Sequence, residues 1–382
     1  MKMKKIIVEY LKTYKEKKLT QQIENLIKNE TFENVDNVLP DKVDKVAIVT
    51  SYVAAHAGGM TSILRIGTAL CNENFDVKYI SLSSQSKKEI EENAHINLEN
   101  YKGIMVTKEA VNDCYDVIIA TDWKSVYTVT RMNGYKMYFV QDYEPYFCED
   151  GERYILAKKT YELGLHMVSL GNWNKREIER NVNVETLIDY IDFPYEKSEY
   201  HLVERNYMEY NKKKVIHLVV YLKKAGRRLP TLIPLMLKKV KEKLKRDGIN
   251  LKISFYGGIE KIPAELGENL GKLSKAELME LYSKADFGMV SSMTNISLVP
   301  FEMLATGLPV IEFADGTFPY FFEKESAILT TFSADDLYHK IKKNIEYPDN
   351  LRILHENAMD CMKDLSWENT GKQFAYILKR LV

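Results

Sequence analysis

The sequence predicts an α/β protein built from two parallel-sheet domains, and three observations lead to this prediction. The chain has 382 residues, which is long enough for two domains. Short, almost wholly apolar segments alternate with amphipathic ones, as buried parallel strands alternate with helices. A polar, charged stretch that ends near Lys214 divides these segments into two series. We therefore expect an N-terminal helical extension (1–40), a first domain (41–200), a second domain (212–365) and a final helix (366–382).

Composition argues against several classes of protein. Lys and Arg together number 54, as do Asp and Glu, so the net charge of zero gives no electrostatic case for nucleic-acid binding. The four cysteines show neither a CxxC pair nor metal-ligand spacing, which indicates reduced thiols in a cytoplasmic protein. No apolar run predicts a signal peptide or a transmembrane helix.

Residues 1–30 form a basic, amphipathic segment in which lysines alternate with isoleucine, leucine and valine. This pattern predicts one or two helices packed on the first domain or on a second subunit. The alternative is a surface that contacts anionic lipid as a peripheral membrane protein does. We favour the packed helix, because aromatic anchors are nearly lacking.

The first domain opens with a strand at 45–51, followed by the turn His56-Ala57-Gly58-Gly59-Met60-Thr61 and a helix. Strand, glycine-rich turn and helix are typical of a Rossmann-like unit. The turn is not GxGxxG, which disfavours a dehydrogenase. Gly58 and Gly59 would let a ligand approach the backbone closely, and the alternative is a tight turn without a ligand. Further strands are expected at 75–82, 103–107, 116–121, 136–140, 166–170 and 184–193.

Acidic residues follow two strands of the first domain. Asp122 comes after the strand at 116–121, and Asp142 and Glu144 come after the strand at 136–140. Functional groups collect beyond the carboxyl ends of parallel strands, so each carboxylate could orient an acceptor hydroxyl. The alternative is helix N-capping, which Asp favours in any protein.

The second domain opens with a strand at 215–221 that runs into a basic turn containing Lys223, Arg227 and Arg228. Cations directly after a strand suit a diphosphate, which Arg can bind through two hydrogen bonds and Lys as a point charge. The alternative is a solvated basic loop. Strands are also expected at 252–258, 287–291 and 310–313, and helices at 232–244, 274–286, 333–344 and 350–365.

The segment 294–313 predicts the start of a ligand-binding helix. Asn295 or Ser297 can serve as N-cap, Pro300 suits the first turn, and Gly307 ends the helix. A helix start after a strand presents free N–H groups that can hold a phosphate. Glu302 lies in the next turn, where it could accept bonds from sugar hydroxyls. Taken alone, the pattern favours a capped helix with a surface Glu.

Two stretches resemble glycosyltransferase family 4, whose members have the GT-B fold. They are Ser297-Leu298-Val299-Pro300-Phe301-Glu302-Met303-Leu304-Ala305-Thr306-Gly307-Leu308-Pro309-Val310 and Gln141-Asp142-Tyr143-Glu144-Pro145-Tyr146-Phe147 with Arg153-Tyr154. The resemblance extends over most of 45–380 and is closest to a branch of rhamnosyltransferases. Many members carry a Glu eight residues before the one that Glu302 matches, but this chain has Thr294 there. That departure puts the usual contact to the transferred sugar in doubt.

The resemblance implies two Rossmann-like domains facing across a cleft, with the last helix crossing back onto the first domain. It implies a diphosphate bound by Lys223, Arg228 and Arg227. The other implied donor-binding residues are Gly58, Gly59, Tyr256, Thr294, Asn295, Ile296, Ser297 and Leu298. Glu302, Arg228, Lys223 and Asp142 are the expected catalytic residues, and Asp122, Asp142 and Glu144 the expected acceptor-binding residues. No metal and no cofactor are expected.

The predicted function is that of a retaining glycosyltransferase in cell-surface polysaccharide synthesis. The predicted location is the cytoplasm, with the inner face of the cell membrane as the alternative. It would move rhamnose from dTDP-rhamnose onto a glycan or lipid-linked glycan. One alternative is a UDP- or GDP-sugar-dependent enzyme. A second is a non-catalytic nucleotide-sugar-binding subunit, for which Thr294 is the best support. A GT-B epimerase or phosphorylase is a third, although no pyridoxal-phosphate lysine site is evident.

Overall fold

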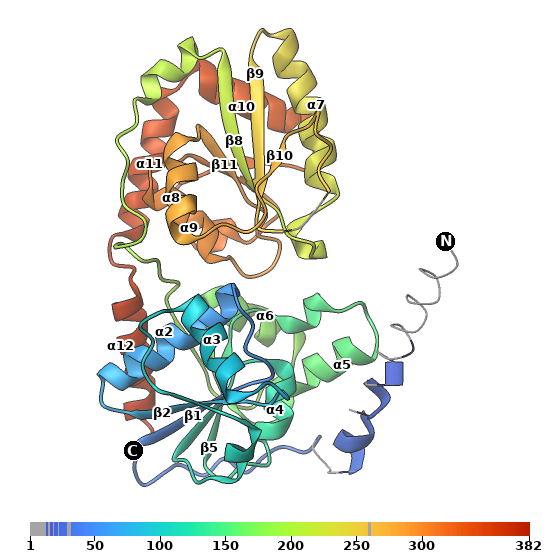
Figure 1. Ribbon diagram of the computed structural model, residues 1–382, viewed down its shortest axis with the longest axis vertical. Helices are drawn as coiled ribbons and strands as arrows, with labels where there is room; N and C mark the ends of the chain where they lie inside the picture. The colour runs from blue at the N-terminus through green and yellow to red at the C-terminus, as the bar shows by residue number, and fades with distance from the viewer. Residues whose placement is uncertain (1–12, 14–15, 18, 22, 29–31, 259–260) are drawn as a thin grey trace.

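The computed structural model describes residues 13, 16–17, 19–21, 23–28, 32–258 and 261–382. Two parallel sheets stand one above the other, and each carries helices on both faces (Figure 1). This arrangement confirms the predicted α/β fold of two Rossmann-like domains. No helix in the described part of the chain is long and apolar enough to span a bilayer.

The first domain is built on a seven-stranded sheet of order β3-β2-β1-β4-β5-β6-β7. Residues along β1 alternate between the two faces: Val46 and Ile48 pack in one hydrophobic core and Ala47 and Val49 in the other. Helices therefore cover both faces. The strands are β1 (Lys45–Thr50), β2 (Asp76–Ser81), β3 (Ile104–Val106), β4 (Val117–Ala120), β5 (Tyr135–Val140), β6 (His166–Leu170) and β7 (Ile188–Ile191). The helices are α2 (Gly58–Asn72), α3 (Lys87–Asn97), α4 (Trp123–Val129), α5 (Glu152–Lys159) and α6 (Asn172–Asn181).

The second domain is built on a six-stranded sheet of order β10-β9-β8-β11-β12-β13. Its strands are β8 (Val215–Tyr221), β9 (Asn250–Tyr256), β10 (Glu268–Asn269), β11 (Phe287–Met289), β12 (Val310–Phe313) and β13 (Ile328–Thr330). Its helices are α7 (Leu232–Arg246), α8 (Lys275–Lys284), α9 (Leu298–Ala305), α10 (Ala334–Glu346) and α11 (Asp349–Met362). In both sheets the order of the strands reverses beside the first strand of the domain, which is where α/β proteins bind ligands.

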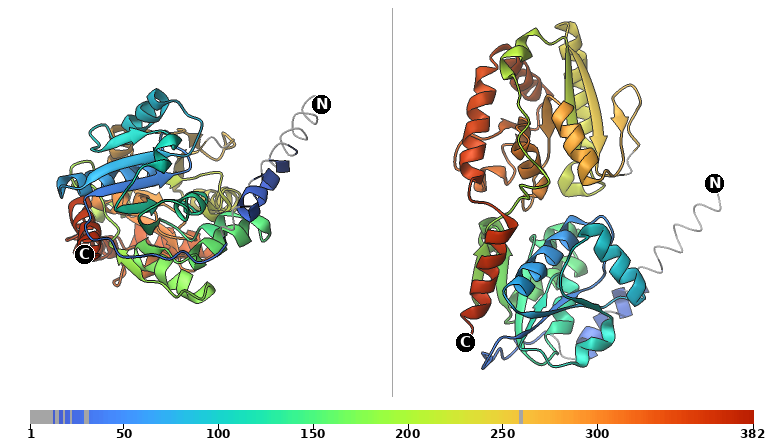
Figure 2. Two further views of the ribbon diagram at one scale, coloured as in Figure 1. Left: turned by 90° about the horizontal axis from the view of Figure 1, so that it is seen from below. Right: turned by 60° about the vertical axis from the view of Figure 1, so that its left-hand side comes forward.

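The last helix, α12 (Trp367–Lys379), leaves the second domain and packs on the first (Figure 2). Gly371 lies against α2 so closely that an added Cβ would be 2.2 Å from the Cβ of Ala69. Phe374 packs edge-on against Phe139 of β5, with ring centres 5.7 Å apart. The predicted return of the C-terminal helix to the first domain is therefore correct.

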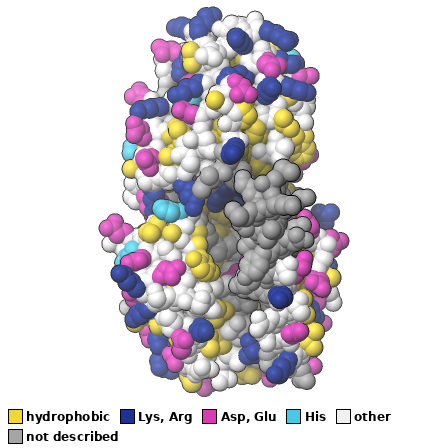
Figure 3. Space-filling model, turned by 45° about the vertical axis from the view of Figure 1, so that its right-hand side comes forward, with side chains coloured by type: hydrophobic (Ala, Val, Ile, Leu, Met, Phe, Trp, Pro, Cys, Tyr) yellow, Lys and Arg dark blue, Asp and Glu magenta, His cyan; other side chains and the backbone are white. Residues whose placement is uncertain are grey.

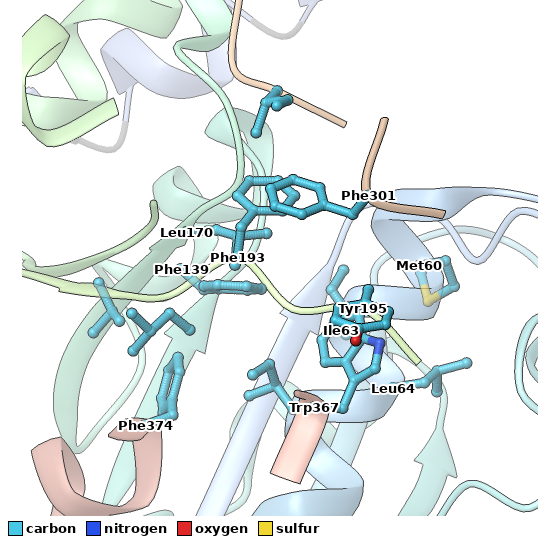
Figure 4. Close-up of a cluster of buried hydrophobic side chains, with 14 of the residues drawn as sticks. Met60, Ile63, Leu64, Phe139, Leu170, Phe193, Tyr195, Phe301, Trp367 and Phe374 are labelled. Carbon is cyan, nitrogen blue, oxygen red and sulfur yellow. The ribbon is translucent and has the colours of Figure 1, made fainter. Parts of the chain in front are cut away.

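A hydrophobic joint connects the two domains beside the linker. Phe193, which follows β7, stacks on Phe301 of α9 with ring centres 5.5 Å apart and planes 2° apart (Figure 4). Phe193 also meets the edge of Phe321 at 5.6 Å. These contacts set how the second domain sits over the carboxyl ends of the first sheet.

The described part of the N-terminal segment packs on the first domain. Leu26 is buried in the core that holds Trp123 and Leu156. Farther along, Phe32 meets the edge of Tyr127 at 5.9 Å, and the Val35 N–H donates to the carbonyl of Leu163. These contacts favour the packed alternative for the described residues. The rest of the predicted extension, including residues 1–12, lies outside the described part.

Some element boundaries differ from those predicted. The strand expected over 184–193 covers only Ile188–Ile191, and Leu187 just before it is 60% exposed. The strand expected over 287–291 ends at Met289. After the bond from the Val290 N–H to the Ile311 carbonyl, the Ser292 N–H donates to the Glu312 side chain instead of to the backbone of β12. β10 was not predicted, since its two residues are exposed and carry no apolar pattern.

Candidate active site

A cavity of about 500 Å³ lies between the domains at the carboxyl ends of both sheets. The first domain contributes the segments after β1, β4 and β5, and the second contributes those after β8 and β11. The face in Figure 3 shows basic side chains at the waist between the domains. The cavity thus lies where ligands bind in open α/β sheets.

The three predicted cations Lys223, Arg227 and Arg228 all line this cavity. Arg228 is 7% exposed and donates from Nη1 to the carbonyl of Ser291 at 2.7 Å. Arg227 lies with its guanidinium carbon 3.8 Å from the centre of the Phe147 ring, and its Nε is 3.8 Å from Oδ2 of Asp142. The Nε of Arg227 is buried and has no hydrogen-bond partner. The three cations therefore gather on the second-domain side of the cavity, across from the carboxylates of the first domain.

The start of α9 faces the same cavity. Ser297 occupies the N-cap position, as predicted, but its side chain makes no capping hydrogen bond. Its hydroxyl is buried without a partner, and Ile296, Ser297 and Leu298 all line the cavity. The first N–H groups of a helix have no acceptor within the helix. An anion in the cavity could satisfy both these groups and the hydroxyl.

The loop before α9 is attached to the first domain through Asp142. Thr294 donates from its hydroxyl to Oδ2 of Asp142 at 2.9 Å, and the Asn295 N–H donates to Oδ1 at 3.1 Å. Burial raises the pKa of Asp142, and the charge of Arg227 opposes the rise. Asp142 therefore organises the loop from across the cleft as well as facing the cavity.

Glu302 lines the cavity one turn into α9 and is partly buried. Burial raises the pKa of its carboxyl to about 7, and the nearby Glu199 contributes to the rise. The charge of Lys275 and the neighbouring Tyr200 hydroxyl both oppose the rise. Glu302 can therefore exist in either protonation state near neutral pH, as acceptor or donor to a hydroxyl.

The carboxylates of Asp122 and Glu144 line the cavity but are held by the protein. Asp122 caps α4, accepting from the N–H groups of Lys124 at 3.0 Å and Ser125 at 3.1 Å. Glu144 is buried and accepts from the Trp123 N–H at 2.6 Å. Burial raises the pKa of Glu144 well above its usual value, and the neighbouring Asp122 adds to the rise. For Asp122, the capping role that the sequence left open is the one observed.

Gly58 and Gly59 begin α2 and line the cavity. An added Cβ at Gly58 would meet nothing within 4 Å, and one at Gly59 would be 3.4 Å from the Gln141 side chain. The protein's own packing thus does not demand glycine at these positions. This openness is consistent with close approach of a ligand.

Two predicted donor-binding residues do not line the cavity. Tyr256 is buried in the core, where its hydroxyl hydrogen-bonds that of Tyr282 at 2.6 Å. The predicted contact of Tyr256 with the nucleotide is therefore replaced by a packing role. Thr294 is 3% exposed and points at Asp142 instead of the cavity. Its contribution to the site is therefore through the loop and Asp142.

Sequence reasoning missed several residues of the site. Gln141, Phe147 and Phe193 line the cavity, and Glu312 accepts a hydrogen bond from the N–H of Ser292, in the loop before α9. Gln141 and Phe147 belong to the segment after β5, so their place at a strand end was an available signal. Phe193 also follows a strand, β7, but the sequence prediction placed it inside that strand. Glu312 lies within β12, so its sequence position gave no such signal.

Comparison with solved structures gives matches that extend over most of the chain. Sucrose-phosphate synthase from Thermosynechococcus elongatus is 14% identical and covers 88% of this chain and 99% of its own, with a TM-score of 0.65. The chain has the GT-B fold. A glycosyltransferase from Rickettsia africae (13% identity, 89% and 99% covered, TM-score 0.66) is similar to this GT-B chain. So is Anabaena HepE in complex with UDP-glucose (13% identity, 88% and 99% covered, TM-score 0.66).

Comparisons of the sequence itself gave no match to any protein-family model or curated protein. The likeness of the GT-B chain to the solved structures thus lies in its fold, at an identity too low to carry a substrate or a mechanism.

Proposed function

We propose that the protein is a glycosyltransferase that takes a nucleoside-diphosphate sugar as donor. One observation carries the proposal: Lys223, Arg227 and Arg228 share a cavity with the uncapped start of α9, between the two domains of a GT-B fold. These are two independent means of holding negative charge. Among proteins of this fold, HepE has been solved with UDP-glucose, which supports the choice of ligand class.

The diphosphate would lie between the three cations and the N–H groups of Ile296, Ser297 and Leu298. When the bond from the sugar to the diphosphate breaks, negative charge grows on the departing oxygen. Fixed cations and amides in a partly closed cavity stabilise that charge without having to reorganise. The acceptor oxygen forms the new bond to the sugar, and its proton passes to the leaving phosphate. We propose retention of configuration, with no metal and no cofactor required.

Glu302 would bind a hydroxyl of the sugar or ribose, because it faces the cavity from the turn after the anion site. The acceptor glycan would enter along the first domain, where Asp142, Asp122 and Glu144 line the opposite wall. All three carboxylates already accept protein hydrogen bonds, and Asp142 differs from the other two in facing the Arg227 cation, with 3.8 Å between Oδ2 and Nε. Each of the three stays a candidate for orienting an acceptor hydroxyl.

The finer proposal is transfer of rhamnose from dTDP-rhamnose to a cell-surface glycan, on the strength of the resemblance around residues 141–154 and 297–310. A UDP-sugar donor is the second candidate, and the HepE complex with UDP-glucose favours it. The donors differ in both base and sugar, so a single assay can separate them.

The assay incubates the full chain, without added metal, with dTDP-rhamnose, UDP-glucose or GDP-mannose and measures release of the nucleoside diphosphate. Slow hydrolysis in the absence of an acceptor is expected with one donor and not with the others. Release from dTDP-rhamnose alone supports the rhamnosyltransferase proposal, and release from UDP-glucose alone replaces it with the second candidate. Absence of release from every donor, with and without a mixed glycan acceptor, would favour a non-catalytic binding subunit.

A further inference from the structure

Glu312 is a carboxylate in the interior of the second domain. It lies in β12 between Ile311 and Phe313, and all three residues are fully buried. An ionisable side chain in the centre of a parallel sheet is costly unless its oxygens are hydrogen-bonded. Such a residue needs a function that an apolar side chain could not supply.

Both oxygens of Glu312 are bonded to one residue, Ser292. The Ser292 N–H donates to Oε2 at 3.0 Å, and the hydroxyl donates to Oε1 at 2.7 Å. The ladder between β11 and β12 ends just before this point, with the bond from the Val290 N–H to the carbonyl of Ile311. The Glu312 side chain thus holds the segment after β11 to β12 beyond the point where the backbone hydrogen bonds between the two strands end.

Thr317 fixes the other side of the same segment. Its N–H donates to the Ser292 carbonyl at 2.6 Å, and its hydroxyl lies 3.1 Å from the same carbonyl and 2.5 Å from the carbonyl of Thr294. The N–H, hydroxyl and carbonyl of Ser292 are therefore all hydrogen-bonded to the segment from β12 to Thr317. Ser292 itself is 0% exposed and does not line the cavity.

The neighbouring residue, Ser291, accepts the hydrogen bond from Arg228. Its carbonyl receives Nη1 at 2.7 Å, which leaves the rest of the guanidinium at the wall of the cavity. Burial raises the pKa of Glu312 to about 7, and the Ser292 hydrogen bonds and then the charge of Arg228 oppose the rise. Ser291 and Ser292 thus connect Arg228 to Glu312, through the hydrogen bond to the Ser291 carbonyl and the two hydrogen bonds from Ser292.

We propose that Glu312 is a positioning residue that holds the Ser291–Ser292 segment and thereby fixes the Arg228 guanidinium where a nucleoside diphosphate binds. The inference rests on the proposed function, because it takes Arg228 as a ligand of the diphosphate. Glu312 touches neither the cavity nor the reacting atoms, and its effect must pass through Arg228.

The test compares Glu312→Ala and Glu312→Gln. Gln can retain both bonds, because its amide oxygen accepts from the Ser292 N–H and its amide N–H can donate to the hydroxyl. Ala can retain neither. Affinity is measured by calorimetry with whichever of dTDP, UDP, GDP and ADP the wild type binds best. We expect Glu312→Ala to weaken binding about tenfold and Glu312→Gln to stay within about threefold of the wild type.

A matched control is Asp286→Asn. Asp286 is also a buried carboxylate of this domain, but it sits at the opposite end of β11, where it pairs with Lys213 and accepts from the His217 N–H at 2.8 Å. Its replacement should lower the melting temperature without changing nucleotide affinity. In an Arg228→Ala background, Glu312→Ala should weaken binding no further. The proposal is overturned if Glu312→Ala binds the nucleotide as tightly as the wild type does. It is also overturned if Glu312→Ala lowers the affinity of the Arg228→Ala variant by a further tenfold.

If Glu312→Ala does not fold, Ser292→Ala replaces it, with an expected loss of about threefold that also depends on Arg228; unchanged affinity would overturn the proposal. If the wild type binds none of the four nucleotides, the proposed function itself fails. The positioning role is then decided by a crystal structure of Glu312→Ala. Displacement of Arg228 from the Ser291 carbonyl supports it, and an unmoved guanidinium overturns it.

Discussion

Asp142 of the first domain and Asn295 of the second are joined across the cleft by a hydrogen bond of 3.1 Å from the Asn295 N–H to the carboxylate. The Asn295 side chain extends this contact by donating to the carbonyls of Gln141 at 2.7 Å and Leu170 at 2.9 Å. The loop that precedes α9 is therefore positioned by both domains. The affinity for a ligand at the start of α9 must therefore depend on the position of the first domain.

Replacing Asp142 by Asn should lower turnover about tenfold or more. An amide offers one oxygen instead of two, so either Thr294 or Asn295 loses its acceptor, and Arg227 loses its ionic partner. Steady-state kinetics checks this, with Asp150→Asn as control because Asp150 is an exposed carboxylate in the same segment. Equal turnover in both variants would show that Asp142 is dispensable.

Replacing Arg228 by Ala should reduce turnover about a hundredfold while the protein stays folded. The guanidinium lines the cavity, and the hydrogen bond that the fold loses with it is the one to the Ser291 carbonyl. Lys224→Ala is the matched control, since Lys224 is an exposed cation in the same turn that does not line the cavity. A similar loss of turnover in both variants would indicate that Arg228 contributes only to the overall positive charge of the turn and makes no specific contact with the phosphate.

Glu302 should make the stability of the protein depend on pH. Its folded-state pKa of about 7 lies above the usual value for a Glu in an unfolded chain, about 4.3, so the folded state binds more protons between these two values. The free energy of unfolding therefore falls as pH rises from about 4.3 to 7 and is flat above that range. Glu302→Gln lacks this dependence.

Melting temperatures at pH 5 and pH 8 test this prediction. Relative to Glu302→Gln, the wild type should lose about 2–4 °C between the two pH values. Glu312 titrates in the same range, but it is present in both proteins, so the comparison cancels it. If the difference in melting temperature between the wild type and Glu302→Gln is the same at both pH values, Glu302 does not occupy a partly buried, desolvated position.

Asp122 should act through stability more than through acceptor binding. Asp122→Ala removes the N-cap of α4 and the acceptor for the Ser51 N–H, which should cost about 1–2 kcal/mol of unfolding free energy. Asp122→Asn should be closer to the wild type, because Asn also caps helices. Denaturant unfolding measures both. If Asp122→Asn is as stable as the wild type but has a much higher KM for acceptor, Asp122 contacts the acceptor directly.

The strands and the strand-end residues could be predicted from sequence because their signals are local. Val46, Ala47, Ile48 and Val49 form a run buried on both faces, and Lys223, Arg227 and Arg228 follow the next domain's first strand. Thr294 could not be placed in this way, because its partner Asp142 is 152 residues away. Tyr256 was misplaced for a related reason: only the packing against Tyr282 shows that its side chain points into the core.

The central claim is that the cavity between the domains binds a nucleoside diphosphate. Thermal unfolding of the wild type and of Arg228→Ala, with dTDP, UDP, GDP, ADP or NAD and no added metal, tests it most directly. A ligand that binds only the folded state raises the melting temperature by mass action. The account predicts that one nucleoside diphosphate stabilises the wild type, that NAD does not, and that the shift is largely lost in Arg228→Ala. No shift with any diphosphate, or an equal shift in both proteins, would contradict it.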